Sequence, residues 1–579
     1  MPLHDLPPET LAAILVLLHP RDAISSLRVS RFWNDLLLSS PDIKYRMELW
    51  RDGLIFADSL GLTPTESLER LYRRRKVWRS LMPVQEHTIP MQSMEVCRAY
   101  ELGGGLFALQ EDTGGFVRVP FARLMDANAA DAHAVKETSE LPVPMAAFKD
   151  FAMDPGQDLL VNLSAADGEV KLELTRLSEP LVEHPEAKTA VFRFQQSAEN
   201  AVILTIQILD DIIVVFFRSG ARFLVFDWRK GELVVDRSWD EDHPEYNVSD
   251  CFFITPRSFF LACVSVRGPQ FQHGCLRLFS LSMPNGAIKL LVALNLPYLA
   301  ESDPDKVHVS TMWVMAPNYT AVPAAGLPYY QSNERRIFSI AIQYSANEWV
   351  RLVLHARTLL RLVEKYQDYA DPDVLRAYRW EEWGPMQTRM FRGMPHLWPR
   401  HVHGERMALP TRNARYIQYL DFNTAYLCEP EQPIVRPDSP ASTDPVEHNP
   451  SRPTSPSPLD IFPDFVPTPD DDDDGDDDGE PFPDDAVDVD VVYTAEQPTD
   501  LQMSIWVSES RDEELVMTRA ELFRIPVTTS LPFRRTQKVL FAEDAQLERM
   551  YHIFLLEEDH IVAANAEDTE HEVTVFRMG

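Results

Sequence analysis

Hydrophobic residues change their spacing along the chain, from a helical period near the N-terminus to short, strand-like runs afterwards. Apolar side chains three and four positions apart form one face of an α-helix. Such stripes are Leu11, Ile14, Leu15 and Leu18, then Ile24 and Leu27, then Trp33, Leu36 and Leu37. We expect Pro20 to end the first helix and Asp22 to cap the second by accepting a backbone N–H.

Residues 64–82 predict one longer helix with an incomplete apolar stripe that includes Trp78. It carries the main basic cluster of the chain, Arg73-Arg74-Arg75-Lys76. We interpret it as a linker helix that packs its Trp78 face on the next domain and leaves its arginines in solvent. The alternative reading of the cluster is a nuclear localisation signal.

From residue 84 to 429, and again from 491 to 579, short runs rich in Val, Ile, Leu and Phe dominate. Charged or Gly-containing turns separate them at hairpin spacing, which indicates antiparallel strands. Helical periods of useful length are nearly absent there, so a doubly wound α/β sheet is not expected. The clearest runs are 159–163, 171–177, 212–217, 223–227, 259–264, 276–281, 337–344, 350–355 and 573–578.

A loose repeat pairs one strand with a second that ends in a turn. Its best example runs from Asp210 to Leu233 and contains Asp227-Trp228 before the turn residue Gly231. Units of four strands at this spacing are typical of a β-propeller, which closes into a ring. We predict an α+β multidomain protein, with a small all-α N-terminal domain and a propeller of seven or eight blades. A pair of β-sandwiches is the alternative.

The longest apolar stretch, residues 201–217, contains Asp210 and Asp211, which would be costly inside a membrane. We interpret it as two strands around a turn. The N-terminus lacks a basic region and a cleavage site, so no signal peptide is expected. The five cysteines form no CxxC pair, and we expect reduced thiols, with Cys251, Cys263 and Cys275 on strands rather than on a metal. These features predict a soluble protein of the cytoplasm, the nucleus or both.

The net charge of −34 is concentrated in one segment. Residues 431–490 hold 19 Asp and Glu against 2 Arg, together with 13 of the 45 prolines. Such a composition predicts a disordered acidic insert. A calcium loop at 474–485 is disfavoured because Pro481 and Pro483 interrupt it. The acidic chain also argues against nucleic acid and membrane partners.

Catalytic signatures are missing from the sequence: there is no P-loop, GxSxG, HExxH or GxGxxG. His401 and His403, with His396 nearby, are a weak metal candidate without an evident third ligand. Trp380 and Trp383 lie in a loop-like context, and we interpret them as the cap of a blade rather than a recognition surface. No cofactor and no enzymatic activity are expected.

The first helices carry a recognisable motif, LPPETLAAILVLLHPRDAISSLRVSRFWNDLL. In order and spacing it resembles the F-box, and the chain is similar to basidiomycete-type fungal F-box proteins. Ser30, Ala23 and Ile24 depart mildly from the usual pattern. The resemblance implies docking on a Skp-family adaptor and through it on a cullin scaffold. By position, the implied adaptor-binding residues are Leu6, Pro7, Pro8, Ile14, Leu15, Leu18, Leu27, Val29 and Trp33, some of which must instead form the core of the module.

The resulting hypothesis is a substrate-recognition subunit of an SCF-type cullin–RING ubiquitin ligase whose β domain binds an unknown target protein. An F-box scaffold that acts outside the ligase and a propeller enzyme are the alternatives. The predicted organisation is an F-box at 1–50, linker helices at 51–83, a propeller-like domain at 84–430 and 491–579, and the acidic insert at 431–490.

Overall fold

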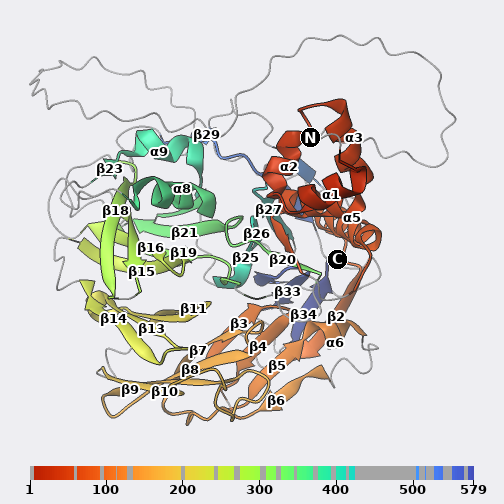
Figure 1. The fold of residues 1–579 in the computed structure, drawn as a ribbon. Coiled ribbons are helices and arrows are strands. Elements are labelled where there is room, and N and C mark those ends of the chain that lie inside the picture. Colours follow the sequence, from red (N-terminus) through yellow and green to blue (C-terminus); the bar gives the residue numbers. More distant parts are fainter. Residues whose placement is uncertain are drawn as a thin grey trace, which may run out of the picture. The chain divides into compact units, whose positions relative to one another are not determined.

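A computed structural model of the chain shows an N-terminal group of helices followed by sheets (Figure 1). The structure describes residues 6–57, 61–91, 97–112, 114–126, 135–196, 203–239, 246–265, 274–283, 285–299, 308–320, 322, 328–344, 348–368, 376–392, 399–411, 416–423, 504–507, 515–516, 527–538, 551–565 and 572–579. All of them belong to one of two compact units, Met1–Cys428 together with Gln502–Gly579. The predicted insert at 431–490 lies outside the described residues.

Four short helices form the N-terminal module, hereafter the helical module. They are α1 (Pro8–Val16), α2 (Pro20–Ser26), α3 (Arg31–Ser39) and α4 (Pro41–Arg51). Their shared apolar core consists of Leu15, Ala23, Leu37, Ile43 and Met47, with Leu27, Trp33 and Leu36 among the side chains packed against it. The three expected helices are therefore present, and α4 adds a fourth that supplies two core residues.

Local chemistry sets where these helices begin. The Ser30 hydroxyl accepts a hydrogen bond from the Trp33 N–H, which caps α3. The predicted cap at Asp22 is wrong, because α2 begins at Pro20 and Asp22 lies inside its first turn. Proline is tolerated at the first helical position, where its missing N–H has no intrahelical partner to lose.

After α4 ends at Arg51, the described residues up to 83 contain one helix, α5 (Pro64–Ser80), where several were expected. Thr63 and Glu66 form a capping box at its start, with the Glu66 carboxylate accepting from the Thr63 N–H at 2.8 Å. Ahead of α5, the short strand β1 (Leu54–Phe56) pairs with β20 (Tyr329–Gln331). Trp78 of α5 is buried and stacks on Tyr419, as the sequence predicted.

Seven sheets follow the helices, each with at least four strands. In the order of pairing within each sheet, blade one is β3 (Ala99–Gly103), β4 (Leu106–Gln110), β5 (Phe116–Pro120) and β6 (Glu137–Ser139); blade two is β7 (Phe148–Asp154), β8 (Leu159–Ala166), β9 (Glu169–Arg176) and β10 (Val191–Gln195); blade three is β11 (Ile203–Leu209), β12 (Ile212–Phe217), β13 (Arg222–Asp227) and β14 (Glu232–Ser238).

The remaining blades are built in the same way. Blade four is β15 (Tyr246–Thr255), β16 (Ser258–Ser265), β17 (Cys275–Ser282), β18 (Ala287–Asn295) and β23 (Ala377–Tyr378); blade five is β19 (Val309–Met315), β21 (Ile337–Tyr344), β22 (Trp349–His355) and β24 (Thr388–Arg392); blade six is β25 (Val402–His403), β26 (Arg406–Pro410), β27 (Ile417–Asp421), β31 (Arg534–Lys538) and β28 (Ser504–Val507); blade seven is β32 (Ile553–Leu556), β33 (His560–Ala564), β34 (Glu572–Arg577) and β2 (Gln85–Pro90). A further pair, β29 (Leu515–Val516) and β30 (Thr528–Thr529), lies beside blade five.

The sheets form a seven-bladed β-propeller. Successive first strands contact one another, β3 with β7, β7 with β11, β11 with β15 and β15 with β19, so they surround the centre of the ring. Figure 1 shows the blades following one another around this centre in chain order. This arrangement excludes the sandwich alternative and confirms the lower of the two predicted blade counts.

The strand β12 explains why its sequence, IIVVFF, is apolar at every position. Ile213, Val215 and Phe217 pack into one core between blades, with residues of blade two. Ile212, Val214 and Phe216 pack into another, with residues of blade four. A strand buried on both faces has no polar alternation.

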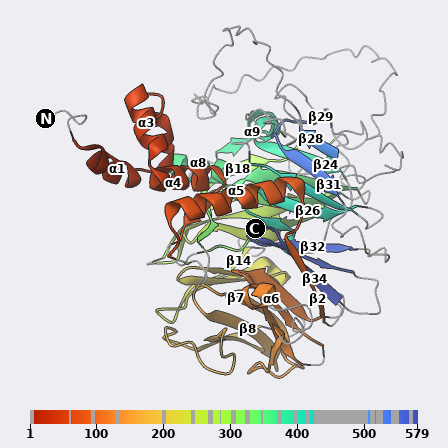
Figure 2. The ribbon, with the colours of Figure 1, turned by 90° about the vertical axis from the view of Figure 1, so that its right-hand side faces the viewer.

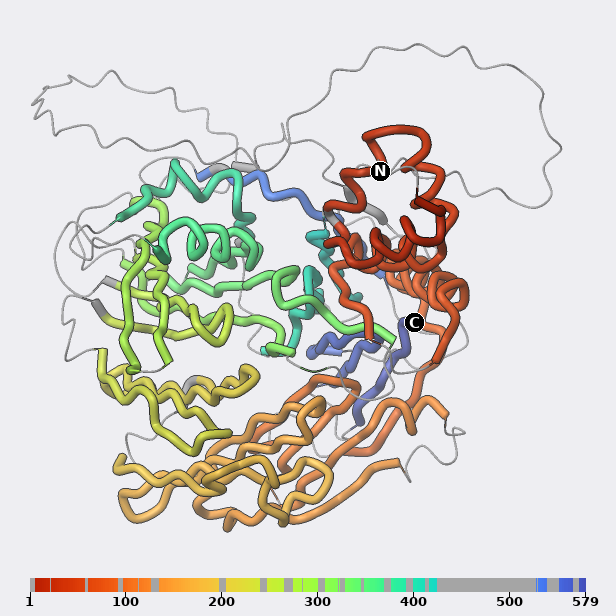
Figure 3. The backbone as a smooth tube through the Cα atoms, in the orientation of Figure 1, coloured from red at the N-terminus to blue at the C-terminus, as the bar shows by residue number. Residues whose placement is uncertain are grey.

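The ring is closed by strands from opposite ends of the chain. β2, which follows α5, pairs antiparallel with β34, from Gln85 opposite Arg577 to Pro90 opposite Glu572. Figure 3 shows the two strands side by side. Blade seven therefore combines three C-terminal strands with one N-terminal strand, and this pairing joins distant parts of the chain in one sheet.

Among the described residues of the propeller, three helices were not predicted: α6 (Phe121–Asp126), α8 (Ala356–Tyr366) and α9 (Trp380–Gln387). The expected loop around Trp380 is wrong, because α9 is helical and contacts blades four and five. Both Trp380 and Trp383 are buried. The two tryptophans therefore cap the blades, which is the interpretation that the sequence favoured over a recognition surface.

Candidate docking surface of the helical module

The helical module exposes large apolar side chains on α1, on α3 and at its turns. Leu17 is 85% exposed, Val29 is 71% exposed and Leu38 is 50% exposed. Ile14, Leu18 and Phe32 are partly exposed as well. We call these six residues the docking surface. Exposed apolar groups gathered on one small module make it a candidate site of protein interaction.

The residues predicted by position divide between this surface and the core of the module. Ile14, Leu18 and Val29 belong to the docking surface, and Pro7 and Pro8 are also exposed. Leu6 is half-buried. These positions are accessible to a partner without rearrangement of the module.

Three of the predicted residues contribute to the core instead. Leu15 is 5% exposed and lies inside the core cluster, so its assignment as an adaptor contact is corrected. Leu27 and Trp33 are half-buried and pack against the same cluster. These residues were predicted from apolar stripes with i, i+4 spacing, and such a stripe is the face that a short helix packs against its neighbouring helices.

Leu17, Phe32 and Leu38 were missed by the sequence reasoning. They lie off the helical stripes, where an apolar residue is normally assigned no role. A signal was present at Leu17, since Ile14 to Leu18 is an unbroken apolar run that one helix face cannot bury.

Helix α5 ties the module to blade seven through a buried arginine. The Arg74 Nε donates to Asp559 Oδ1 at 2.6 Å, and its Nη2 donates to Glu558 Oε1 at 2.5 Å. Burial opposes the charge on Arg74, but the two carboxylates raise its pKa above the ordinary value. The expectation that the basic cluster is solvated is therefore wrong at Arg74, and Arg75 also pairs inward, with Glu48 and Asp52.

A second joint connects the end of α4 to blades five and six. The Arg335 guanidinium lies 5.3 Å from the Trp50 ring centre and donates to the Trp50 carbonyl oxygen. It also pairs with Glu405 at 2.7 Å. Beside it, the Gln331 side chain donates to the Gly53 carbonyl oxygen, next to the β1–β20 pairing. In Figure 2, α5 runs along the sheets while α1 and α3 extend away from them.

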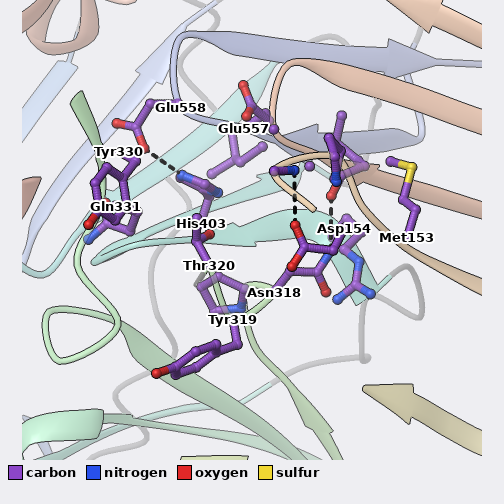
Figure 4. A pocket seen from close by; sticks show the side chains of 18 of the residues that line it. Met153, Asp154, Asn318, Tyr319, Thr320, Tyr330, Gln331, His403, Glu557 and Glu558 are labelled. Atoms are coloured by element: carbon purple, nitrogen blue, oxygen red, sulfur yellow. Dashed lines mark hydrogen bonds and ion pairs between the residues drawn. The ribbon is translucent and has the colours of Figure 1, made fainter. Parts of the chain in front are cut away.

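The propeller holds one described pocket where turns of several blades meet near β20. Its volume is about 50 Å³, and Asp154, Tyr319, His403 and Glu558 are among the residues that line it. Figure 4 shows His403 directed at Glu558, with Nε2 and Oε2 3.0 Å apart. The Asp154 carboxylate accepts from the Gly156 N–H and from Gln157. These polar groups satisfy one another, and the space suits a few waters.

The candidate metal ligands are separated by their contacts. His401 is fully buried beside Arg351, with 2.6 Å between its Nε2 and Arg351 Nη1, whereas His403 faces Glu558. His396 lies outside the described residues. Within the described ranges, no group of three or more His, Cys, Asp or Glu side chains is arranged to hold a metal ion. In the same ranges, no helix is long and apolar enough to cross a membrane.

Comparison with protein-family models and with curated proteins returned no match. Among solved structures, the chain is similar to the WD40 domain of SCAP from fission yeast, with 12% identity over 56% of this chain and 67% of that chain and a TM-score of 0.27. It is also similar to the β-propeller domain of Cps50 (Swd1) from Myceliophteria thermophila, with 9% identity over 58% and 86% of the two chains and a TM-score of 0.32. The chain is also similar to the WD40 domain of coronin from Toxoplasma gondii, with 10% identity over 59% of this chain and 74% of that chain and a TM-score of 0.30. The propeller assignment rests on the strand pairing described above.

Proposed function

We propose that this protein is the substrate-recognition subunit of an SCF-type cullin–RING ubiquitin ligase, acting in the cytoplasm, the nucleus or both. The observation that carries the proposal is the docking surface, since it exposes six large apolar residues on the helices and turns of the module that holds the F-box-like motif. A Skp-family adaptor would bury these residues. Apolar anchors surrounded by polar residues supply most of the energy of such interfaces.

In this proposal the propeller binds the target protein. Seven blades give a rigid frame whose loops differ in sequence, and loops on such a frame are where binding residues gather. The two joints hold the helical module against blades five, six and seven, which keeps an adaptor and a target at a defined separation. Tethering would raise the local concentration of target lysines near the ubiquitin-conjugating enzyme, with no chemical step in this chain.

The test uses two substitutions on the docking surface, Leu17→Asp and Val29→Asp, in the full-length chain. Both side chains are more than two-thirds exposed, so folding should be unaffected. We expect each to weaken binding of a purified Skp-family adaptor at least about tenfold, because a charge would be buried at the interface. Leu181→Asp is the matched control, since Leu181 is 64% exposed in blade two, away from the module.

Co-purification of the wild-type chain with both adaptor and cullin supports the proposal. Adaptor binding without cullin would point to the scaffold role outside the ligase. The proposal is overturned if the wild-type chain binds no adaptor, or if the two docking-surface variants bind it as well as the Leu181 variant does.

A further inference from the structure

Blade four contains two cysteines that face each other directly across neighbouring strands. Cys263 of β16 and Cys275 of β17 are antiparallel partners in register. Both are buried, belong to the same apolar core and are free thiols. We propose that this pair is a reversible redox site, which closes to a disulfide on exposure to peroxide. The inference goes beyond the proposed function and does not depend on it.

The strand geometry places the two sulfurs within reach of a bond. Residues directly opposite in antiparallel strands have Cβ atoms about 4.5–5.5 Å apart, and a disulfide needs about 3.5–4.5 Å. Closure therefore requires the strands to approach by about 1 Å. The backbones are already close at this end of the hairpin, because a Cβ at Gly274 would lie 3.1 Å from the Cys263 carbonyl oxygen.

A bond made with that adjustment stores strain, and strained disulfides are reduced more easily. This property distinguishes a reversible site from a structural disulfide.

The surroundings give the two thiols different roles. The pKa of Cys275 lies below its usual value, because the Cys263 S–H donates toward its sulfur and the Arg277 guanidinium lies nearby. The same hydrogen bond, together with burial, raises the pKa of Cys263. The Cys263 sulfur also lies 3.8 Å from the Leu261 carbonyl oxygen, a second acceptor for its proton. Cys275 is thus the nucleophile and Cys263 the resolving thiol.

The remaining described cysteines lack this arrangement. Burial raises the pKa of Cys251 well above its usual value, and its registered partner on β16 is Leu261. Burial likewise raises the pKa of Cys97 to about 12. Both are therefore internal references for nonspecific oxidation.

The reaction balances with hydrogen peroxide as the oxidant. The Cys275 thiolate attacks one peroxide oxygen, the O–O bond breaks, and Cys275 becomes a sulfenic acid as hydroxide leaves. That hydroxide takes up the proton that Cys275 lost on ionisation and forms the first water. The Cys263 sulfur then attacks the Cys275 sulfur, the S–O bond breaks, and the disulfide forms. The Cys263 proton and the departing hydroxide leave as water. Two thiols are oxidised and one peroxide is reduced to two waters.

The test is peptide mapping of the native full-length protein after titration with hydrogen peroxide. Free thiols are alkylated before digestion, and the disulfide-linked peptides are identified by mass spectrometry without reduction. We expect the Cys263–Cys275 linkage at peroxide concentrations that leave Cys97 and Cys251 reduced, and its loss on addition of dithiothreitol. Circular dichroism during the titration establishes that the protein remains folded.

Two variants separate the roles of the pair. Cys263→Ser should leave a sulfenic acid at Cys275 that dimedone traps, whereas Cys275→Ser should leave Cys263 reduced. Cys251→Ser is the matched control, since it removes a thiol of the same core and leaves both thiols of the pair in place. The inference is overturned if Cys97 or Cys251 oxidises first in the folded wild-type protein, or if dimedone does not label Cys275 in the Cys263 variant.

Discussion

At the scale of single residues, buried arginines hold separate parts of this protein together. Arg74 joins α5 to two carboxylates of blade seven. Arg336 is equally buried but has only carbonyl oxygens as acceptors, those of Pro317, Phe253 and Ile254, and burial lowers its pKa to about 10. A guanidinium donates in several directions, so it can bind carboxylates or carbonyl oxygens, although the Arg336 Nε has no acceptor among the described residues.

Replacing Arg74 tests how much the joint contributes. Arg74→Met should lower the free energy of unfolding by about 3–5 kcal/mol, because Glu558 and Asp559 would remain buried without their cation. Arg73→Met, at the neighbouring exposed position, should change it by less than about 0.5 kcal/mol. Urea unfolding of the two variants at neutral pH measures both values.

The stability contributed by the Arg74 ion pair should depend on pH. Burial alone would raise the pKa of Asp559, but the Arg74 guanidinium holds it below its usual value. The stabilisation is therefore present above the unfolded-state pKa and is lost as pH falls through the lower folded-state value. The difference between wild type and Arg74→Met should shrink in acid. A difference that is constant with pH would contradict an ionic joint.

At the scale of elements, local sequence predicts where helices and strands lie along the chain better than it predicts which of them contact one another. The predicted strands at 212–217 and 337–344 coincide with β12 and β21. Helix α8 has a buried face that runs from Ala356 through Leu359 and Leu362 to Tyr366, but it was missed because it directly continues the strand β22. The insert at 431–490 is flanked by β27 and β28, which belong to one sheet, so it interrupts a single blade.

The start of α5 offers a test at this scale. Thr63→Ala removes the hydroxyl that accepts the Glu66 N–H and should lower the free energy of unfolding by about 1 kcal/mol. Thr65→Ala is the matched control, since Thr65 is exposed in the first turn and caps nothing there; alanine is the better helix former, so no loss is expected. Equal losses in the two variants, measured by urea unfolding, would exclude the capping box as the cause.

At the scale of the whole ring, closure depends on a strand pairing between residues nearly 500 positions apart. Thr88 of β2 lies opposite Thr574 of β34, with 3.2 Å between their hydroxyl oxygens. The chain must bring these strands together from opposite ends before blade seven is complete. Loop closure of that length is entropically costly.

A disulfide across the closure should therefore stabilise the protein more than one within a blade. We expect oxidised Thr88→Cys/Thr574→Cys to gain roughly 2–3 kcal/mol more in free energy of unfolding than oxidised Glu169→Cys/Gln195→Cys, because stabilisation grows with the logarithm of loop length. The control pair is also directly opposed, but within blade two. Urea unfolding of oxidised and reduced samples measures each gain. Equal gains would contradict the prediction that the entropy of closing the long loop makes the β2–β34 disulfide the more stabilising one.

The sequence by itself determined the three helical stripes of the helical module, the longer helix that follows it and the strand character of the blades. These are local properties: a helix stripe repeats within four residues, and a strand such as β12 is apolar throughout its own length. Only the tertiary structure decided that Arg74 is buried, that Leu15 faces inward while Leu17 faces outward, and that seven blades close through β2. Each of these depends on partners distant in the chain, whose positions no local pattern specifies.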